Sequence, residues 1–289
     1  MNLKRKFQIG YWNVGIIENC IQDIMEGKQY RIRWVRHRYI DRFFADPFLY
    51  KVDAENYYIL AEELIFSKGK GTIVLLTVDK KTMRLIERKE IFEDDYHLSY
   101  PNYEDGCVVA ENYQSGGLYR FYINENPVRK ELILDKPMID PTFLKFNGKK
   151  WLFATTKCKP DDPNRKLSIF YENNGEFLPH KKNPVKNDIH TARPGGHFFE
   201  YQGNIYRPAQ NSEHLYGEDI KIMKLLELDE NNFQEEEVMT ISSHNMKHYN
   251  LGLHTFNVEE GFVVVDGFEK SVHILSLIHI SEPTRQAEI

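Results

Sequence analysis

The sequence predicts an all-β fold, a five-bladed β-propeller with a minor N-terminal helix or turn. Three observations support this prediction. Aromatic residues make up 13% of the 289 residues, with 18 Phe and 17 Tyr, and flat rings pack well on pleated, half-buried surfaces. A hairpin-like unit occurs five times. Successive units lie roughly 40 to 60 residues apart, which is the period of a propeller blade.

Each unit begins with a polar residue, often next to proline, and continues into an apolar strand, a short turn and a second strand rich in aromatic residues. The five pairs of strands are 45–49 with 57–62, 99–103 with 107–111, 139–144 with 151–155, 192–199 with 204–208, and 252–257 with 262–266. The turns between them carry hairpin residues, as in Asp105-Gly106, Asn147-Gly148 and Gln202-Gly203. Each unit is therefore predicted to be a β-hairpin.

Further strands complete the blades. Segments 71–78, 117–123, 167–171 and 220–225 are apolar and are predicted to supply a third strand to four blades. Near the N-terminus, apolar residues of 14–25 recur at a helix-like spacing, so we expect a short helix or turn there.

The predicted domains are an N-terminal segment at 1–29, the propeller at 30–274 and a tail at 275–289. The tail resembles a translated sequencing adapter, so we treat it as a read-through artefact. We expect that whatever naturally followed residue 274, whether a closing strand or another domain, is lost.

Charge and composition exclude several function classes. A net charge of −5 and an isoelectric point near 6.1 give no general attraction to nucleic acid. No window approaches the roughly 20 apolar residues that span a bilayer, and the basic start lacks the apolar run of a signal peptide. We therefore expect a soluble, cytoplasmic protein.

No cofactor or metal is expected. The three cysteines are widely separated, and no two histidines fall at i and i+4 on a predicted helix, because His244, His248 and His254 lie in a stretch predicted as loop and strand. Segment 67–72 also lacks the spacing of a phosphate-binding loop.

The residues that begin the first strand of each unit are the candidate site. In a propeller these strands run beside the axis, so their first residues gather at one end of the central channel. Buried charges cost several kcal/mol unless they are paired or hydrated, so ionisable or strongly polar residues at four of the five places indicate a shared polar pocket. These residues are Asp46, Tyr100, Asp140, Arg193 and His254.

The ends of the second strands add further polar residues: Glu62, Glu63, Glu111, Arg207, Gln210 and Asp266. Glu111 is the preferred general acid, because a carboxyl group at the end of a buried strand can have its pKa raised by desolvation. Glu218 competes for that role, and His97 is a candidate for substrate contact.

The motifs resemble a known family. Residues 45–49, 97–101, 139–142, 193–196, 206–210 and 253–257 together resemble the N-terminal domain of glucosamine inositolphosphorylceramide transferases, over roughly residues 30 to 270. That domain is similar to five-bladed glycosidases of the arabinanase and xylosidase type. The resemblance implies a propeller fold and a saccharide or glycoconjugate ligand. It also implies that glycosyl transfer belongs to a separate C-terminal domain, a covalent or separate partner.

In the glycosidases an inverting reaction uses an Asp base, a second Asp that tunes the acid, and a Glu acid. By this resemblance Asp46 is the base and Asp140 the tuning residue, while the acid is open between Glu111, which we favour, and Glu218. The predicted substrate-binding residues are His97, Tyr100, Arg193, Arg207, Gln210, Glu218, His254 and Asp266. Two alternatives stay open: a non-catalytic glycan-binding or scaffold domain, and a polar channel that merely joins the blades through salt bridges.

Overall fold

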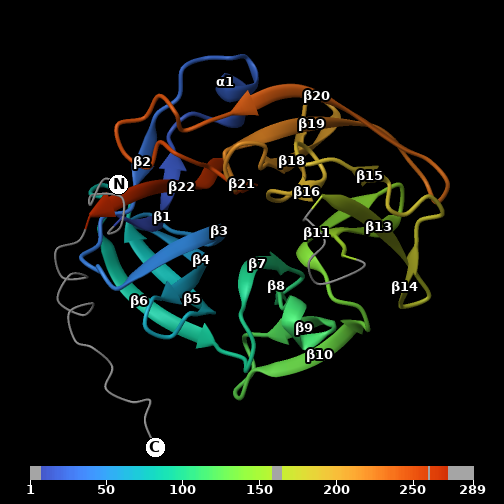
Figure 1. Ribbon diagram of the computed structural model, residues 1–289, viewed down its shortest axis with the longest axis horizontal. Helices are drawn as coiled ribbons and strands as arrows, with labels where there is room; N and C mark the ends of the chain where they lie inside the picture. The colour runs from blue at the N-terminus through green and yellow to red at the C-terminus, as the bar shows by residue number, and fades with distance from the viewer. Residues whose placement is uncertain (1–7, 158–164, 260, 273–289) are drawn as a thin grey trace, which may run out of the picture.

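The computed structural model describes residues 8–157, 165–259 and 261–272. Five antiparallel sheets surround a common centre, and their outer strands form the rim (Figure 1). The predicted five-bladed β-propeller is confirmed. The tail at 275–289 and Cys158 lie outside the described residues. None of the helices in the described part of the chain has the length and apolar character that crossing a membrane requires.

The first three blades follow one another along the chain, each running from the axis to the rim. Blade 1 contains β3 (Arg42–Val52), β4 (Asn56–Ile65), β5 (Lys70–Asp79) and β6 (Leu85–Phe92). Blade 2 contains β7 (Ser99–Glu104), β8 (Cys107–Glu111), β9 (Leu118–Tyr122) and β10 (Arg129–Leu134), with a 3-10 helix at Tyr113–Ser115. Blade 3 contains β11 (Ile139–Phe146), β12 (Lys149–Thr155), β13 (Lys166–Asn173), β14 (Glu176–Pro179) and β15 (Lys186–Asn187).

The last two blades complete the ring. Blade 4 contains β16 (Arg193–Pro194), β17 (Phe199–Tyr201), β18 (Asn204–Asn211), β19 (Asp219–Leu228) and β20 (Phe233–Ile241). Blade 5 contains β21 (Phe256–Glu259), β22 (Phe262–Val272), β1 (Gln8–Ile17) and β2 (Ile32–Trp34). It therefore combines both ends of the described chain.

The predicted hairpin turns form with the backbone that their residues favour. Asp105-Gly106, Asn147-Gly148 and Gln202-Gly203 each have positive φ at both residues. In each case the strands pair on either side of a two-residue loop, as Phe146 does with Lys149. Such loops match the twist of the flanking strands, which explains why residues that tolerate the left-handed region occur there.

The ring is closed by the N-terminus. β1 pairs antiparallel with β22 from Gln8 opposite Val272 to Ile17 opposite Val263, and β2 pairs with β1. The third and fourth strands of blade 5 are thus supplied by β1 and β2 from the N-terminal part of the chain. β1 also lies within residues 1–29, the segment predicted to precede the propeller, so the propeller begins before residue 30.

The expected N-terminal helix is present but short. Helix α1 covers Ile21–Met25, whereas Val14 to Ile17 belong to β1. Val14, Ile16 and Ile17 are all almost fully buried, because β1 packs against blades on both of its faces. A strand buried on both faces need not alternate apolar and polar residues, and its pattern can be mistaken for that of a helix.

The core is divided into five apolar clusters, one at each junction between neighbouring blades. The cluster between blades 5 and 1, for example, joins Val14, Ile16 and Val264 to Phe44 and Ile59. The corresponding clusters lie between blades 1 and 2, 2 and 3, 3 and 4, and 4 and 5. Each sheet thus buries both faces, which fixes the strand starts around the axis.

Ile16→Ala should destabilise the propeller by about 2–5 kcal/mol, because the truncation leaves a cavity in the closing blade. Ile16 is 2% exposed, whereas Leu226 is 51% exposed. The matched control Leu226→Ala should change the free energy of unfolding by less than about 0.5 kcal/mol. Urea unfolding of both variants measures the difference, and equal effects would contradict closure by β1.

Candidate functional site

Three blades begin with an unusual backbone. Asp46, Tyr100 and Asp140 each precede a proline and have φ of 49°, 46° and 51°. A residue before proline normally adopts an extended conformation, and a non-glycine residue held at such φ costs about 1–3 kcal/mol. The strand register shifts at each of these positions. The surrounding structure must therefore compensate for the strain.

The compensation comes from carboxylates of the preceding blade. The amide of Asp46 donates to Asp266 Oδ2 at 3.0 Å, and the amide of Tyr100 donates to Asp46 Oδ2 at 3.1 Å. The amide of Asp140 donates to Glu111 Oε2 at 3.3 Å. Each of these bulges is thus tied to the blade before it, and the predicted site residues are brought together.

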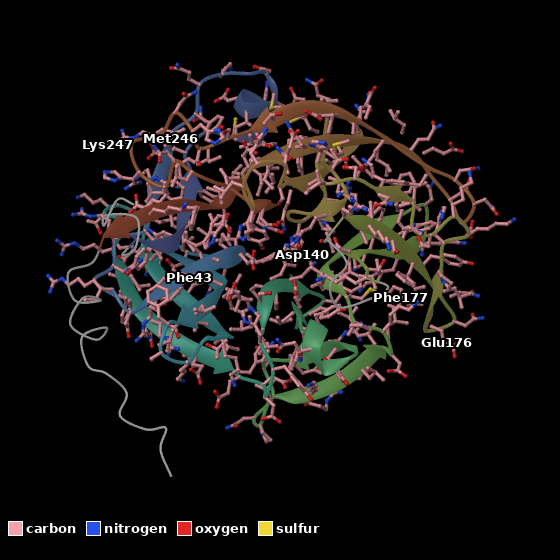
Figure 2. The ribbon with its side chains drawn as sticks, in the orientation of Figure 1. Phe43, Asp140, Glu176, Phe177, Met246 and Lys247 are labelled. Atoms are coloured by element: carbon pink, nitrogen blue, oxygen red, sulfur yellow. The ribbon has the colours of Figure 1, made fainter. Side chains whose placement is uncertain are left out.

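Asp140 lies near the middle of the ring (Figure 2) and is held by two side chains. Arg193 contacts both of its carboxylate oxygens, with Nη2 3.2 Å from Oδ1, and Gln210 Nε2 donates to Oδ2 at 2.9 Å. Asp140 is 1% exposed. Burial alone would lower the pKa of Arg193. Nearby acidic groups, the Asp140 carboxylate first among them, have the larger combined effect and raise this pKa well above its usual range, so the guanidinium group stays charged.

Asp46 is buried between blades 1, 2 and 5. Its Oδ1 accepts a hydrogen bond from the hydroxyl of Thr255 at 3.0 Å, while Oδ2 accepts from the Tyr100 amide. Burial raises the pKa of Asp46 to about 7, with His254 opposing the increase and Glu62, Asp266 and Asp140 adding to it. This carboxyl group therefore changes its ionisation near neutral pH.

His254 lies between two carboxyl groups. Its Nδ1 is 2.5 Å from Asp266 Oδ2 and its Nε2 is 3.6 Å from Asp46 Oδ1. Burial alone would lower the pKa of His254, but Asp266 and Asp46 raise it to about 9. The ring stacks on Trp12, with centroids 3.9 Å apart and planes 13° apart. Asp266 also accepts the amides of His254 and Thr255, which fixes this pair in place.

The two glutamates that compete for the acid role lie in different surroundings. Burial and the nearby Asp140 raise the pKa of Glu111 well above its ordinary value, against the effect of Arg193. Partial burial would also raise the pKa of Glu218, but hydrogen bonds from His214 outweigh it and lower the pKa. We call the largely buried group of Asp46, Glu62, Glu111, Asp140, Arg193, His254 and Asp266 the central cluster. Glu111 contacts the other members through the Asp140 amide, whereas Glu218 contacts His214.

His97 and Arg207 lie outside the central cluster. His97 Nε2 is 3.3 Å from Glu62 Oε1, and its Nδ1 accepts from the Gly71 amide, so it touches the cluster through Glu62. Arg207 is fully buried and binds Glu235 of β20 through Nε at 2.9 Å and Nη2 at 2.6 Å. Arg207 and Gln210 lie three residues apart on β18, and side chains at odd separations point to opposite faces of a strand. The contacts of Arg207 therefore do not support its predicted role in substrate binding.

Three residues of the site were not predicted. Thr255 follows His254 in the sequence and binds Asp46. Trp12 stacks on His254 from β1, a strand that the sequence pattern did not reveal. Tyr216 is 48% exposed, with its ring 5.1 Å from Arg193 Cζ and edge-on to His254 at 5.5 Å. The sequence feature that could have identified Tyr216 was its position two residues before the candidate Glu218.

Asp46, His254 and Asp266 are also arranged as a potential metal site. One ligand atom from each lies within 4.8 Å of the others. The expectation of no metal overlooked this group because Asp46 is far from the other two residues in the sequence. A metal ligates neutral imidazole, whereas the raised pKa of His254 favours its protonated form. A cation would therefore have to displace a proton from His254.

Several solved glycosidases are similar in structure. A family 117 glycoside hydrolase of Zobellia galactanivorans has 12% identity and a TM-score of 0.47, covering 86% of this chain and 96% of that one. The α-L-arabinanase of Cellvibrio cellulosa has 17% identity and a TM-score of 0.45, covering 67% and 77%. The RS223 β-xylosidase has 11% identity and a TM-score of 0.43, covering 78% and 91%.

The sequence relatives are plant proteins. Glucosamine inositolphosphorylceramide transferase 1 of Oryza sativa subsp. japonica is 29% identical over 211 residues, and that of Arabidopsis thaliana is 30% identical over 208 residues. Each match covers 68% of this chain but only 28% and 27% of the respective relative. The family model for glucosamine inositolphosphorylceramide transferase 1, N-terminal, matches residues 34–259. The chain therefore belongs to the family of glucosamine inositolphosphorylceramide transferase 1 N-terminal domains.

Proposed function

We propose that this propeller is carbohydrate-active and hydrolyses a glycosidic bond with inversion, with Asp46 as the base and Glu111 as the acid. The observation that carries the proposal is the pair of raised pKa values, that of Asp46 near 7 and that of Glu111 well above its ordinary value. Inverting glycosidases use two carboxyl groups in this way, one ionised and one protonated. A saccharide ligand also suits the family to which the chain belongs.

Asp140 would tune the acid. Its carboxylate contributes to the raised pKa of Glu111, so the acid stays protonated at a pH where Asp46 can ionise. Arg193 and Gln210 hold Asp140 in one orientation and limit the charge that it adds to the cluster. The exposed ring of Tyr216 next to Arg193 offers a flat apolar surface for a sugar ring.

A second candidate function is a non-catalytic glycan-binding domain of a glycosyltransferase system. This candidate is favoured by the surroundings of Asp46, which is 5% exposed and whose two carboxyl oxygens both already accept hydrogen bonds. Such a carboxyl group has little room to activate water. The chain spans about 28% of the rice relative, so the transferase activity in the relatives' names would require a partner domain, covalent or separate.

Asp46→Asn should lower the turnover of 4-nitrophenyl glycosides at least ~100-fold, because losing a general base typically costs 10²–10⁴-fold. The control Asp135→Asn removes an exposed carboxyl group without a described partner and should keep full activity. Circular dichroism should show both variants folded. An Asp46→Asn variant that turns over at the original rate refutes the role of Asp46.

Glu111→Gln should distinguish an acid from a structural residue. A 2,4-dinitrophenolate leaving group needs no proton, whereas the alkoxide of an oligosaccharide does. The variant should therefore retain most activity on 2,4-dinitrophenyl glycosides and lose at least ~100-fold on oligosaccharides. An equal loss on both substrates would mean that Glu111 does not donate the proton.

The dependence of kcat/KM on pH should be bell-shaped. Activity rises with pH near 7 because Asp46, whose pKa is raised to about 7, must be ionised to act as a base. Activity falls at higher pH because Glu111, whose pKa is also raised, must stay protonated. Glu111→Gln should remove the alkaline decrease and keep the acidic one, and a variant with an unchanged alkaline decrease contradicts the assignment.

If the second candidate is correct, oligosaccharides should bind without turnover, and Asp46→Asn should bind as well as the original protein. In that case Tyr216→Ala should weaken binding at least ~10-fold, equivalent to about 1.4 kcal/mol. The control Leu132→Ala changes an equally exposed apolar residue at the rim and should leave affinity unchanged. Isothermal titration calorimetry measures both, and turnover of any oligosaccharide would rule out this candidate.

A further inference from the structure

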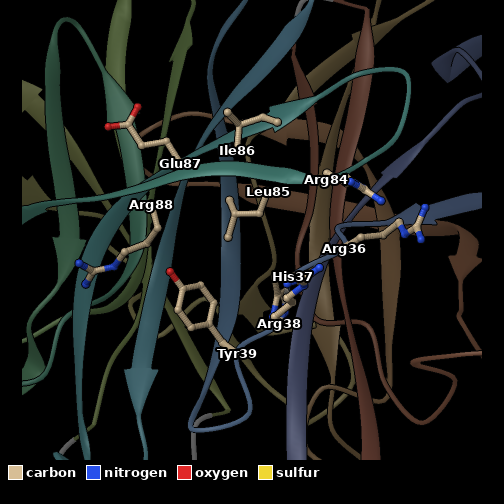
Figure 3. A pocket seen from close by; sticks show the side chains of 9 residues that line it. All are labelled: Arg36, His37, Arg38, Tyr39, Arg84, Leu85, Ile86, Glu87 and Arg88. Atoms are coloured by element: carbon tan, nitrogen blue, oxygen red, sulfur yellow. The ribbon is translucent and has the colours of Figure 1, made fainter.

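A second polar site lies at the rim, where blade 5 connects to blade 1. Residues 36–39 follow β2 and face residues 84–88 at the beginning of β6, enclosing a cavity of about 500 Å³ (Figure 3). Four arginines line this cavity: Arg36, Arg38, Arg84 and Arg88. We call it the arginine pocket. Its volume lies in the range of roughly 300–1,000 Å³ that is usual for small-molecule sites.

Main-chain hydrogen bonds place two of these arginines side by side. The Arg36 amide donates to Met83 O at 2.7 Å, and the Leu85 amide donates to Arg36 O at 3.1 Å, so Arg36 forms a parallel bridge with Arg84. Figure 3 shows both side chains at the same end of the pocket. Like charges on neighbouring strands are destabilising. An anion between them would remove this repulsion.

The described residues do not supply that anion. Arg88 is paired with Glu63 and Glu90. Among the described residues, however, no carboxylate lies within salt-bridge distance of Arg36, Arg38 or Arg84, and all three are exposed. Glu87 also lines the cavity, but Figure 3 draws its carboxylate on the opposite side of β6 from Leu85 and Tyr39. Three guanidinium groups are thus available in a protein whose net charge is −5.

Two further groups suit an anionic ligand with an organic part. His37 Nδ1 is buried and has no hydrogen-bond partner in the described residues, although buried polar atoms are normally paired. Its ring is fixed by an edge-to-face contact with Phe44 at 5.2 Å. Tyr39, which is 37% exposed, supplies apolar surface on the side of β6 where Leu85 also lies.

The positive charge continues into the neighbouring cavity, which shares Arg36. That cavity, of about 670 Å³, has no acidic residue in its lining, and its basic residues are Arg31, Arg33, Arg36, Lys81, Lys247 and His248. Arg33 is paired with Glu18 at 3.3 Å. Basic residues thus outnumber acidic ones in the linings of both cavities, which favours anions near this edge.

We propose that the arginine pocket binds a phosphate ester, with the phosphate between Arg36 and Arg84 and within reach of Arg38. Guanidinium groups match phosphate oxygens through paired N–H donors, and a phosphate monoester has enough negative charge to satisfy several of them. The remaining volume and Tyr39 would accommodate the organic group. The ester could belong to a soluble sugar phosphate or to a phospholipid headgroup, which share this chemistry. The arginine pocket is separate from the central cluster, and the proposed phosphate binding does not depend on catalysis there.

The test is isothermal titration of the full chain with inorganic phosphate and with glucose 6-phosphate, and flotation with phosphatidylcholine vesicles with and without one-fifth phosphatidic acid. The double variant Arg36→Gln/Arg84→Gln should weaken the binding of a phosphate probe at least ~10-fold, since two charge-assisted contacts are lost. The control Arg165→Gln/Lys181→Gln removes the same charge from exposed residues elsewhere and should bind like the original protein. Binding should also weaken as salt is added.

The source of the ester follows from which probe binds. Binding of glucose 6-phosphate that is lost in the Arg36/Arg84 variant assigns the pocket to soluble esters. Flotation that needs phosphatidic acid and is lost in the same variant assigns it to lipid headgroups. If no phosphate probe binds, or if both double variants lose binding equally, the proposal is refuted. Thermal unfolding of the variants should show that the fold is kept. The single variant Arg38→Gln tests the same pocket independently and should also weaken the binding of the phosphate probe.

Discussion

The pairing of β1 with β22 is the constraint on which both sites depend. It joins the two ends of the described chain into blade 5 and brings that blade against blade 1. His254 and Asp266 come from blade 5, whereas Asp46 comes from blade 1 and lies more than 200 residues earlier. Without closure these groups would not meet. The arginine pocket depends on the same junction, because residues 36–39 connect the two blades.

Strain and charge in the central cluster balance each other. Three residues before prolines adopt positive φ, which costs energy, and each donates its amide to a carboxylate of the blade before it. Buried carboxyl groups are costly as well unless they are paired and hydrogen-bonded. The same hydrogen bonds offset both costs, because the strained residues donate the amides that the buried carboxyl groups need as partners. The remaining charge is offset by Arg193 and His254.

The sequence predicted the repeating features and missed those that arise between distant segments. Hairpin turns such as Asn147-Gly148 have a local cause, and the five polar strand starts share a position in the repeat, so both could be found from the pattern. β1 could not, because burial on both faces removes the alternation by which a strand is identified. Trp12 was missed with it. Arg207 was assigned to the site because it lies near the end of a second strand, but its guanidinium group binds Glu235 of β20.

The two sites have opposite charges and hold them in opposite ways. In the central cluster, Asp140 is paired with Arg193 and Asp266 with His254, and burial raises the pKa values of Asp46 and Glu111. In the arginine pocket, three exposed guanidinium groups have no partner in the described chain, and main-chain bonds keep two of them adjacent. Exposure lets water screen that repulsion at modest cost, whereas the buried cluster must satisfy its charges internally. An axis site that titrates near neutral pH and a rim site that stays positive can therefore coexist in one ring, because burial differs between them.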